Sequence, residues 1–219
     1  MGRQPLSILT SKHIEGRLAT RREALRTAGV EPDASLLRSV ATYIELLLRW
    51  NRKINLTTIT DVDEIVERNF GESFLGAGYL PSQAGRYCDV GSGAGFPGLA
   101  LKLVQPAWKA ILLEPVGKKA AFLSEVGHAL GVKGLEVEIA RWQDSQIQPG
   151  TLDVVMARAL GGYEELVEWA NGRVKPQGRL MLWLGGHDAK AIQALPGWKW
   201  QVQPLPSSRE RVLLVGSRP

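Results

Sequence analysis

The spacing of hydrophobic residues predicts helices throughout residues 1–80. One helix follows Asp33, a residue suited to the N-cap, and its apolar positions recur every three to four residues. Those positions are Leu36, Leu37, Val40, Ile44, Leu47 and Leu48. A less regular pattern predicts a helix over residues 11–28, and Asp61 with Glu64 predicts a third helix that begins with a capping box. We therefore expect a helical extension at the start of the chain.

After this extension, short apolar runs alternate with helical stretches, which is typical of β-α-β units and a mostly parallel sheet. The first five predicted strands cover residues 86–90, 110–114, 135–140, 152–157 and 179–184. Two further runs, 198–203 and 211–216, are joined by a Pro-rich turn and predict a terminal antiparallel hairpin. The sequence thus predicts an α/β fold, with a mostly parallel seven-stranded sheet in residues 81–219 and the helical extension in residues 1–80.

Composition narrows the class of protein. The chain has 219 residues, of which 44% are hydrophobic, so a disordered chain is excluded. The single cysteine, Cys88, excludes a disulfide scaffold, and the three histidines show no metal-ligand spacing. No apolar stretch approaches the about 20 residues that a membrane-spanning helix needs. We therefore expect a cytoplasmic protein with no metal and no membrane partner.

The net charge of +5 is unevenly distributed. Residues 1–55 contain ten Lys and Arg against five Asp and Glu, whereas the rest of the chain contains seventeen of each. A basic segment of this kind either contacts a polyanion or forms a solvated helical surface. The charge pattern alone does not decide between these two interpretations.

A glycine-rich loop follows the first predicted strand. It runs from Asp89 to Gly98, reads Asp-Val-Gly-Ser-Gly-Ala-Gly-Phe-Pro-Gly, and precedes a helix. Glycines allow a ligand to approach the backbone closely, and the N-terminus of the next helix offers unpaired N–H groups. Glu114 stands at the end of the second strand, where acidic side chains accept hydrogen bonds from ribose hydroxyls. The loop and this carboxylate predict a nucleoside ligand.

Two nucleoside cofactors fit this loop differently. Gly93, Gly95 and Gly98 satisfy the G-x-G-x-x-G spacing of nicotinamide-dependent oxidoreductases. Asp89 argues against such a cofactor, because a carboxylate at the end of the first strand would repel a pyrophosphate. The same carboxylate suits the ammonium and sulfonium groups of S-adenosylmethionine (SAM), which we take as the cofactor.

The motifs together resemble one family. They are Trp50-Asn51-x-x-x-Asn55-Leu56-Thr57, the loop from Asp89 to Gly98, Gly117-Lys118-Lys119 before Phe122-Leu123, and Ala157-Arg158-Ala159. They are similar to those of the small-subunit ribosomal RNA methyltransferase G family, also called glucose-inhibited division protein B. The resemblance implies a SAM-dependent methyltransferase domain that methylates N7 of a guanine in a conserved loop of 16S rRNA near the decoding site.

The resemblance also implies site residues. Cofactor contacts fall at Gly91, Phe96, Trp142, Gln143 and Arg158. An indole such as that of Trp142 can cover an adenine ring. Arg158 is expected to hold the SAM carboxylate, a phosphate or guanine O6, as a positioning residue.

The expected partner is 16S rRNA or the small ribosomal subunit, and we expect the protein to be a monomer. Basic residues along the motifs are candidates for contact with RNA phosphates. These candidates are Arg52, Lys53, Arg68, Lys118 and Lys119.

The chain departs from the family pattern on the side of the substrate. Where the family commonly has Arg-His-x-x-Asp-Ser, this chain has Asn69 in place of the histidine and Glu72 in place of the aspartate. Where the family usually has Lys-Gly after the fifth strand, it has Gly185 followed by glycine. These departures leave open an RNA-binding protein without catalytic activity.

Overall fold

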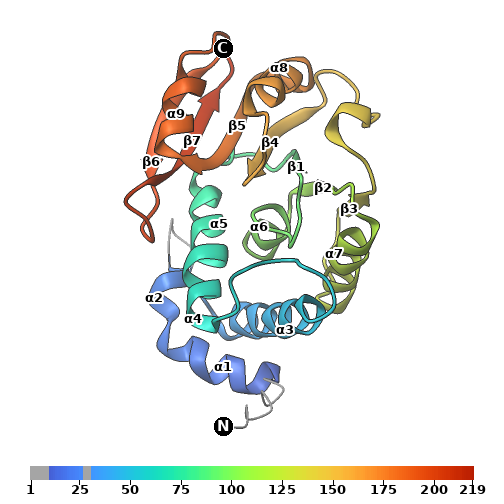
Figure 1. The fold of residues 1–219 in the computed structure, drawn as a ribbon, viewed down its shortest axis with the longest axis vertical. Helices are drawn as coiled ribbons and strands as arrows, with labels where there is room; N and C mark the ends of the chain where they lie inside the picture. Colours follow the sequence, from blue (N-terminus) through green and yellow to red (C-terminus); the bar gives the residue numbers. More distant parts are fainter. Residues whose placement is uncertain (1–9, 27–30) are drawn as a thin grey trace.

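The computed structural model describes residues 10–26 and 31–219, and contains one seven-stranded sheet (Figure 1). The strands are β1 (Arg86–Val90), β2 (Lys109–Leu113), β3 (Leu135–Glu138), β4 (Leu152–Arg158), β5 (Val174–Gly185), β6 (Lys199–Pro204) and β7 (Arg211–Ser217). Their order is β3-β2-β1-β4-β5-β7-β6. β1 to β5 pair in parallel, and β7 is antiparallel to both β5 and β6. The predicted sheet and its terminal antiparallel hairpin are confirmed.

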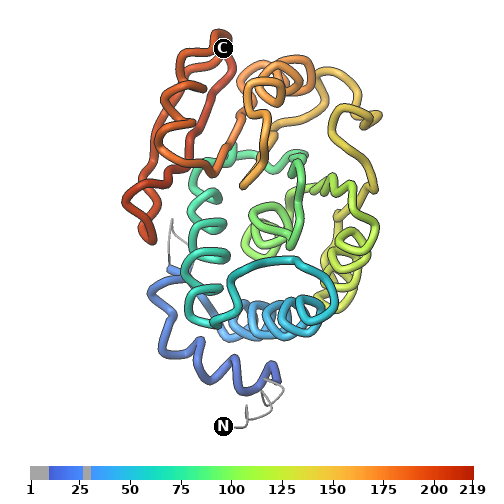
Figure 2. The backbone as a smooth tube through the Cα atoms, in the orientation of Figure 1, coloured from blue at the N-terminus to red at the C-terminus, as the bar shows by residue number. Residues whose placement is uncertain are grey.

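Helices surround the sheet and form the preceding extension. They are α1 (Ser11–Thr20), α2 (Arg22–Leu25), α3 (Ala34–Asn51), α4 (Val62–Glu64), α5 (Glu72–Leu75), α6 (Gly98–Val104), α7 (Gly117–Ala129), α8 (Tyr163–Arg173) and α9 (Gly186–Gln193). A π-helix, η2 (Ile65–Gly71), joins α4 to α5, and the 3₁₀ helices are η3 (Gly76–Tyr79) and η4 (Trp142–Asp144). Figure 2 shows α1 and the C-terminal end of the chain at opposite ends of the long axis. No helix of the described ranges is long and apolar enough to cross a membrane.

The predicted helix starts are confirmed in part. Asp33 caps α3, because its carboxylate accepts a hydrogen bond of 2.7 Å from the Leu36 backbone N–H. Asp61 caps α4 by accepting from the N–H of Glu64 at 3.0 Å. The predicted capping box is wrong in its second half, since the Glu64 carboxylate pairs with Arg68 one turn later. A charged partner on the next turn has replaced the return bond to the backbone.

The single helix predicted over residues 11–28 is wrong for the described part, because it breaks at Arg21 between α1 and α2. The break separates side chains that a continuous helix would place on one face. Leu18 and Leu25 are fully buried, while Arg21 pairs with Asp63 at 2.8 Å. The remaining predicted positions, 27 and 28, lie outside the described residues.

The extension and the sheet share one hydrophobic core. Its largest cluster combines buried residues of α3 and η2 with those of α6 and α7. Tyr43 of α3 is fully buried in this cluster, with its ring stacked on Phe96 at 5.3 Å and edge-on to Phe70 at 5.3 Å. Residues on the two sides of position 80 therefore depend on each other for burial, and the predicted domain boundary stays a prediction.

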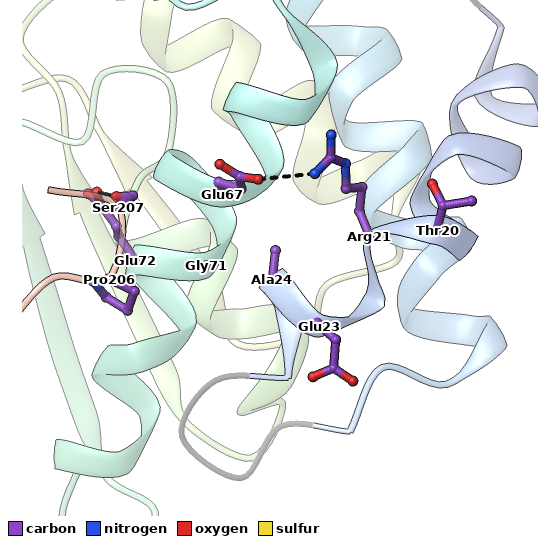
Figure 3. A pocket seen from close by; sticks show the side chains of 9 residues that line it. All are labelled: Thr20, Arg21, Glu23, Ala24, Glu67, Gly71, Glu72, Pro206 and Ser207. Carbon is purple, nitrogen blue, oxygen red and sulfur yellow. Dashed lines mark hydrogen bonds and ion pairs between the residues drawn. The ribbon is translucent and has the colours of Figure 1, made fainter.

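α2 packs closely against the π-helix (Figure 3). A Cβ atom on Gly71 would lie 2.8 Å from the backbone oxygen of Ala24, so a larger residue would push the two segments apart. Beside this contact lies a cavity of about 380 Å³, which Arg21 and Glu67 border as an ion pair at 3.4 Å. The contact fixes the position of the helix segment that carries Asn69 and Glu72.

Candidate active site

The glycine loop joins β1 to α6 and turns sharply three times. Gly91, Gly93 and Gly95 have φ angles of +69°, +54° and +84°, which side chains other than glycine rarely adopt. At Gly95 the space is filled as well, since a Cβ atom would lie 2.0 Å from the Tyr43 hydroxyl oxygen. Glycine at these positions is therefore required by the shape of the loop.

Two buried tyrosines anchor the loop backbone. The Tyr43 hydroxyl donates a hydrogen bond to the Ala94 carbonyl at 2.7 Å, and the Tyr87 hydroxyl donates to the Gly98 carbonyl at 2.7 Å. Sequence reasoning missed Tyr43, although its position on the buried face of the predicted helix marked it as a core residue. The extension thus helps to build the loop.

Asp89 lies beneath the loop, with only 1% of its surface exposed. Its Oδ2 atom accepts a hydrogen bond from the Gly98 backbone N–H at 3.0 Å, at the start of α6. Its Oδ1 atom is buried and has no hydrogen-bond partner among the described residues. Burial raises the pKa of Asp89 to about 7, against the smaller opposing effect of the Gly98 bond. A cation brought to this carboxylate would favour its ionised form.

Glu114 follows β2 and is also almost fully buried. Its carboxylate accepts hydrogen bonds from the backbone N–H groups of Gly93 at 2.8 Å and Val116 at 2.9 Å. Each carboxylate oxygen has a second lone pair, so these bonds leave acceptor capacity for a ribose hydroxyl. The predicted pair of loop and carboxylate is therefore in direct contact.

An open cleft of about 650 Å³ lies between the loop and the extension. We call it the loop cleft. Its lining residues are Asn55, Leu56, Thr57, Thr58, Ile59, Asn69, Gly91, Ser92, Gly93, Ala94, Phe96, Lys119, Arg158 and Ala159. Of the residues that the sequence predicted, it brings together Gly91, Gly93, Phe96, Lys119 and Arg158. The segment 55–59 was missed as a wall of the site.

Asn51 shapes this wall. Its side-chain Oδ1 accepts hydrogen bonds from the N–H groups of Leu56 at 2.9 Å and Thr57 at 3.0 Å, and its Nδ2 donates to the Thr57 carbonyl at 2.9 Å. One amide therefore satisfies three backbone groups of a turn that has no regular secondary structure. Asn51 of the Trp-Asn motif thus holds the turn that forms one wall of the loop cleft.

Arg158 lies at the end of β4, between the loop cleft and a second cavity of about 350 Å³. Its guanidinium donates to the Arg68 carbonyl at 2.8 Å and pairs with Glu72 at 3.2 Å. Glu72 is 1% exposed and also binds Arg211, at 2.6 and 3.0 Å, and Ser207. Burial lowers the pKa of Arg158, and Glu72 opposes this effect. The arginine is therefore fixed in place by a buried carboxylate.

Trp142 and Gln143 lie in η4, after β3, and outside the lining of the loop cleft. Gln143 is exposed, whereas Trp142 is partly buried and packs edge-on against Trp169 of α8 at 5.8 Å. β3 is two strands from β1 in the sheet. The two residues can therefore reach only the part of a ligand that extends along the sheet edge.

The predicted RNA-binding residues are distributed over several elements. Lys119 lines the loop cleft, Lys118 is exposed in the first turn of α7, and Arg52 and Lys53 are exposed after α3. Arg68 is paired with Glu64 and lines the second cavity. Among the described residues no group of three or more His, Cys, Asp or Glu could hold a metal ion.

The site fits SAM on its own geometry. A buried carboxylate with an unpartnered oxygen under the loop suits a cationic ligand, and Glu114 beside Gly93 suits a ribose. The fold agrees, because a solved SAM-dependent methyltransferase from Aquifex aeolicus matches it with a TM-score of 0.59 at 16% identity. That match covers 71% of this chain and 93% of the other. The fold and the site define a SAM-dependent methyltransferase.

Sequence comparisons give the family. The model described as GidB, rRNA small subunit methyltransferase G, matches residues 36–204. A ribosomal RNA small subunit methyltransferase G from Halorhodospira halophila is 36% identical over 185 residues, which is 84% of this chain and 83% of the relative. One from Shigella flexneri is 30% identical, covering 89% and 96%. The chain belongs to the rRNA small subunit methyltransferase G family, and its cofactor is SAM rather than a nicotinamide dinucleotide.

We predict that Gly93→Val abolishes SAM binding. A β-branched residue at a φ of +54° is strained, and its side chain would project into open space of the loop cleft. Gly131→Val is the matched control, because Gly131 has a φ of +61° with open space around it, at the end of α7. Calorimetry should show full SAM affinity for the control and none for Gly93→Val. Equal affinity of the two folded variants would contradict this site.

We also predict that SAM affinity rises with pH through about 7. The pKa of Asp89 is raised, so the cofactor-free protein holds a proton near pH 6 that the cationic ligand must displace. The same shift means that, without SAM, the Asp89 contribution to stability falls as pH rises from about 4 to 7. Asp89→Asn should remove most of the several-fold change in SAM affinity between pH 6 and 7.5. The same pH dependence of SAM affinity in wild type and in Asp89→Asn would show that it arises from titration of the ligand and would contradict the prediction.

Proposed function

We propose that this protein transfers the methyl group of SAM to N7 of a guanine in 16S rRNA of the small ribosomal subunit. We further propose that it acts in the cytoplasm as a monomer. The observation that carries the proposal is the loop cleft, in which a SAM-type glycine loop faces a wall built by the extension. The space between the glycine loop and this wall can hold the base that accepts the methyl group.

The proposed cofactor contacts follow the order of the strands. Asp89 faces the cationic end of SAM, and the backbone of Gly91, Gly93, Gly95 and Phe96 surrounds it. Arg158, which lines the same cleft, also contacts the cofactor. Glu114 holds the ribose, because it lies at the end of the adjacent strand. The adenine extends toward β3, where Trp142 and Gln143 lie. SAM supplies an electrophilic methyl group, and the residues of the chain hold it in place.

Methylation of guanine N7 needs alignment rather than proton transfer. N7 carries an in-plane lone pair at neutral pH, so the nitrogen attacks the methyl carbon while the carbon–sulfur bond breaks and its electron pair stays on sulfur. No general base is required. Holding the three atoms in line and excluding water lowers the barrier by several kcal/mol. The rigid loop and the pinned segment 55–59 serve this alignment.

Positive charge moves from sulfur to the base during the transfer, so an uncompensated cation near N7 would slow it. Arg158 lines the loop cleft, but its guanidinium is paired with the buried Glu72. We infer that Arg158 positions a carboxylate or a phosphate. The neighbouring Asn69 adds a neutral polar group to the same wall.

The target base must be unstacked to reach the loop cleft, because the deep and narrow major groove of A-form RNA hides N7. Lys119 at the cleft and Lys118 beside it would contact phosphates of the bound strand. Arg52, Lys53 and Arg68 would extend this contact across the extension. Cations at the N-terminus of α7 oppose the helix dipole, and a bound phosphate would offset that cost.

The test is incubation with methyl-labelled SAM and small ribosomal subunits that lack their native methylations. Nucleoside analysis of the digested RNA should show labelled 7-methylguanosine at one site. Free 16S rRNA assayed in parallel shows whether the assembled subunit is needed. Label absent from both RNAs, with a protein that binds SAM in calorimetry, would contradict the proposal and favour a binding-only role.

We predict that Lys118→Glu with Lys119→Glu weakens RNA binding and flattens its salt dependence. Each lost phosphate contact should lower the log–log slope by about 0.7 on a single strand. The matched control reverses Lys109 and Lys133, which are exposed near the amino ends of β2 and β3, away from the loop. Filter binding across salt concentrations measures both slopes. Equal slopes in the two double variants would show that Lys118 and Lys119 do not contact phosphates.

A further inference from the structure

Asn69 is one of two buried polar residues that line the loop cleft, the other being Ser92. It is 4% exposed, its side-chain amide makes no hydrogen bond to another described residue, and the amide atoms are not among those shut off from solvent. Its backbone belongs to the π-helix η2, and its backbone carbonyl accepts a hydrogen bond from the Ser73 hydroxyl. Because Asn69 lines the loop cleft, the hydrogen-bonding capacity of this amide is met from the cleft, by water or by a ligand.

The position of Asn69 shows where such a ligand would lie. The residue lines the loop cleft together with Gly91, Phe96 and Arg158. It lies in the π-helix η2, and π-helical turns occur frequently at functional sites. Phe70, the next residue, is fully buried against Tyr43 and Phe96, so the local backbone is firmly packed. The amide is therefore presented to the cleft from a rigid segment.

The chemistry of the target favours a neutral donor at this place. On the edge of guanine that carries N7, the second acceptor is O6. When N7 faces the methyl group, O6 remains to be satisfied beside it. A guanidinium there would oppose the positive charge that develops on the base. Arg158 carries such a guanidinium, and the donors that Glu72 and the Arg68 carbonyl leave over suit the anionic carboxylate or phosphate proposed for it better than O6.

We propose that Asn69 is a specificity-determining residue, whose side-chain Nδ2–H donates a hydrogen bond to O6 of the target guanine. The bond would orient the base so that N7 lies in line with the methyl group. Adenine presents a donor, N6–H₂, at the equivalent place, so the same amide orientation disfavours adenine. This inference rests on the proposed function, and deepens it by assigning a contact to the substrate base.

The first experiment separates substrate from cofactor. In Asn69→Leu and Asn69→Asp the donor is lost, so kcat/KM for the RNA substrate should fall roughly 10- to 100-fold. SAM affinity by calorimetry should stay within about twofold of wild type, since the proposed bond touches only the base. Asn171→Asp, on α8 and outside the loop cleft, is the control and should keep full activity. A parallel loss of SAM affinity would overturn the proposal and assign Asn69 to the cofactor.

The second experiment tests the contact with O6 itself. RNA with 6-thioguanosine at the target position carries a weaker acceptor, and wild type should lose more activity on it than Asn69→Leu does. An equal fold loss of activity in the two proteins would overturn the proposal, because the free-energy effects of two independent changes are additive. If Asn69→Leu does not fold, Asn69→Asp is used in its place. Equal activity of the wild-type protein on RNA with guanosine and on RNA with 6-thioguanosine would by itself overturn the proposal. Wild type inactive on unmodified RNA would instead contradict the proposed function.

Discussion

The buried carboxylate of Glu72 joins three parts of the molecule that are distant in sequence. It belongs to the extension, and it binds Arg158 at the end of β4 and Arg211 at the start of β7. Removing one partner of such a buried pair typically costs 3–5 kcal/mol, because the other charge is left without compensation. The carboxylate thus fixes the extension on the sheet and holds Arg158 between two cavities. The geometry of the proposed site depends on this arrangement.

The extension is consequently part of the site rather than an appendage to it. Tyr43 anchors the glycine loop, Asn51 pins the opposite wall of the loop cleft, and Asn69 opens into it. A methyl donor bound by the sheet and an acceptor admitted by the extension would meet between these groups. Because the same packing supports both walls, cofactor binding and base binding are expected to be coupled in this protein.

The sequence predicted what depends on neighbours along the chain. The alternation of apolar runs predicted the positions of the strands along the chain, though not their order in the sheet. It also predicted that Asp89, Glu114 and Arg158 lie at the carboxyl ends of strands, and therefore at one edge of the sheet. It could not predict contacts across long separations, such as Glu72 with Arg211, 139 residues apart. Apolar spacing likewise gave no sign of the π-helix that carries Asn69, since its residues suit an α-helix equally well. The break in the helix at Arg21 was missed because the spacing of apolar residues carries no information about the acidic residues with which Arg21 pairs, Asp63 and Glu67.

We propose that methyl transfer takes place in the cleft between the glycine loop and the extension. The most direct measurement is a structure of the protein with S-adenosylhomocysteine and an RNA fragment that contains the target guanosine. We expect the adenosyl group along Glu114, the guanine between the loop and segment 55–59, and N7 directed at the sulfur. A guanine bound outside the loop cleft, or a cofactor that leaves Asp89 and Glu114 uncontacted, would contradict it.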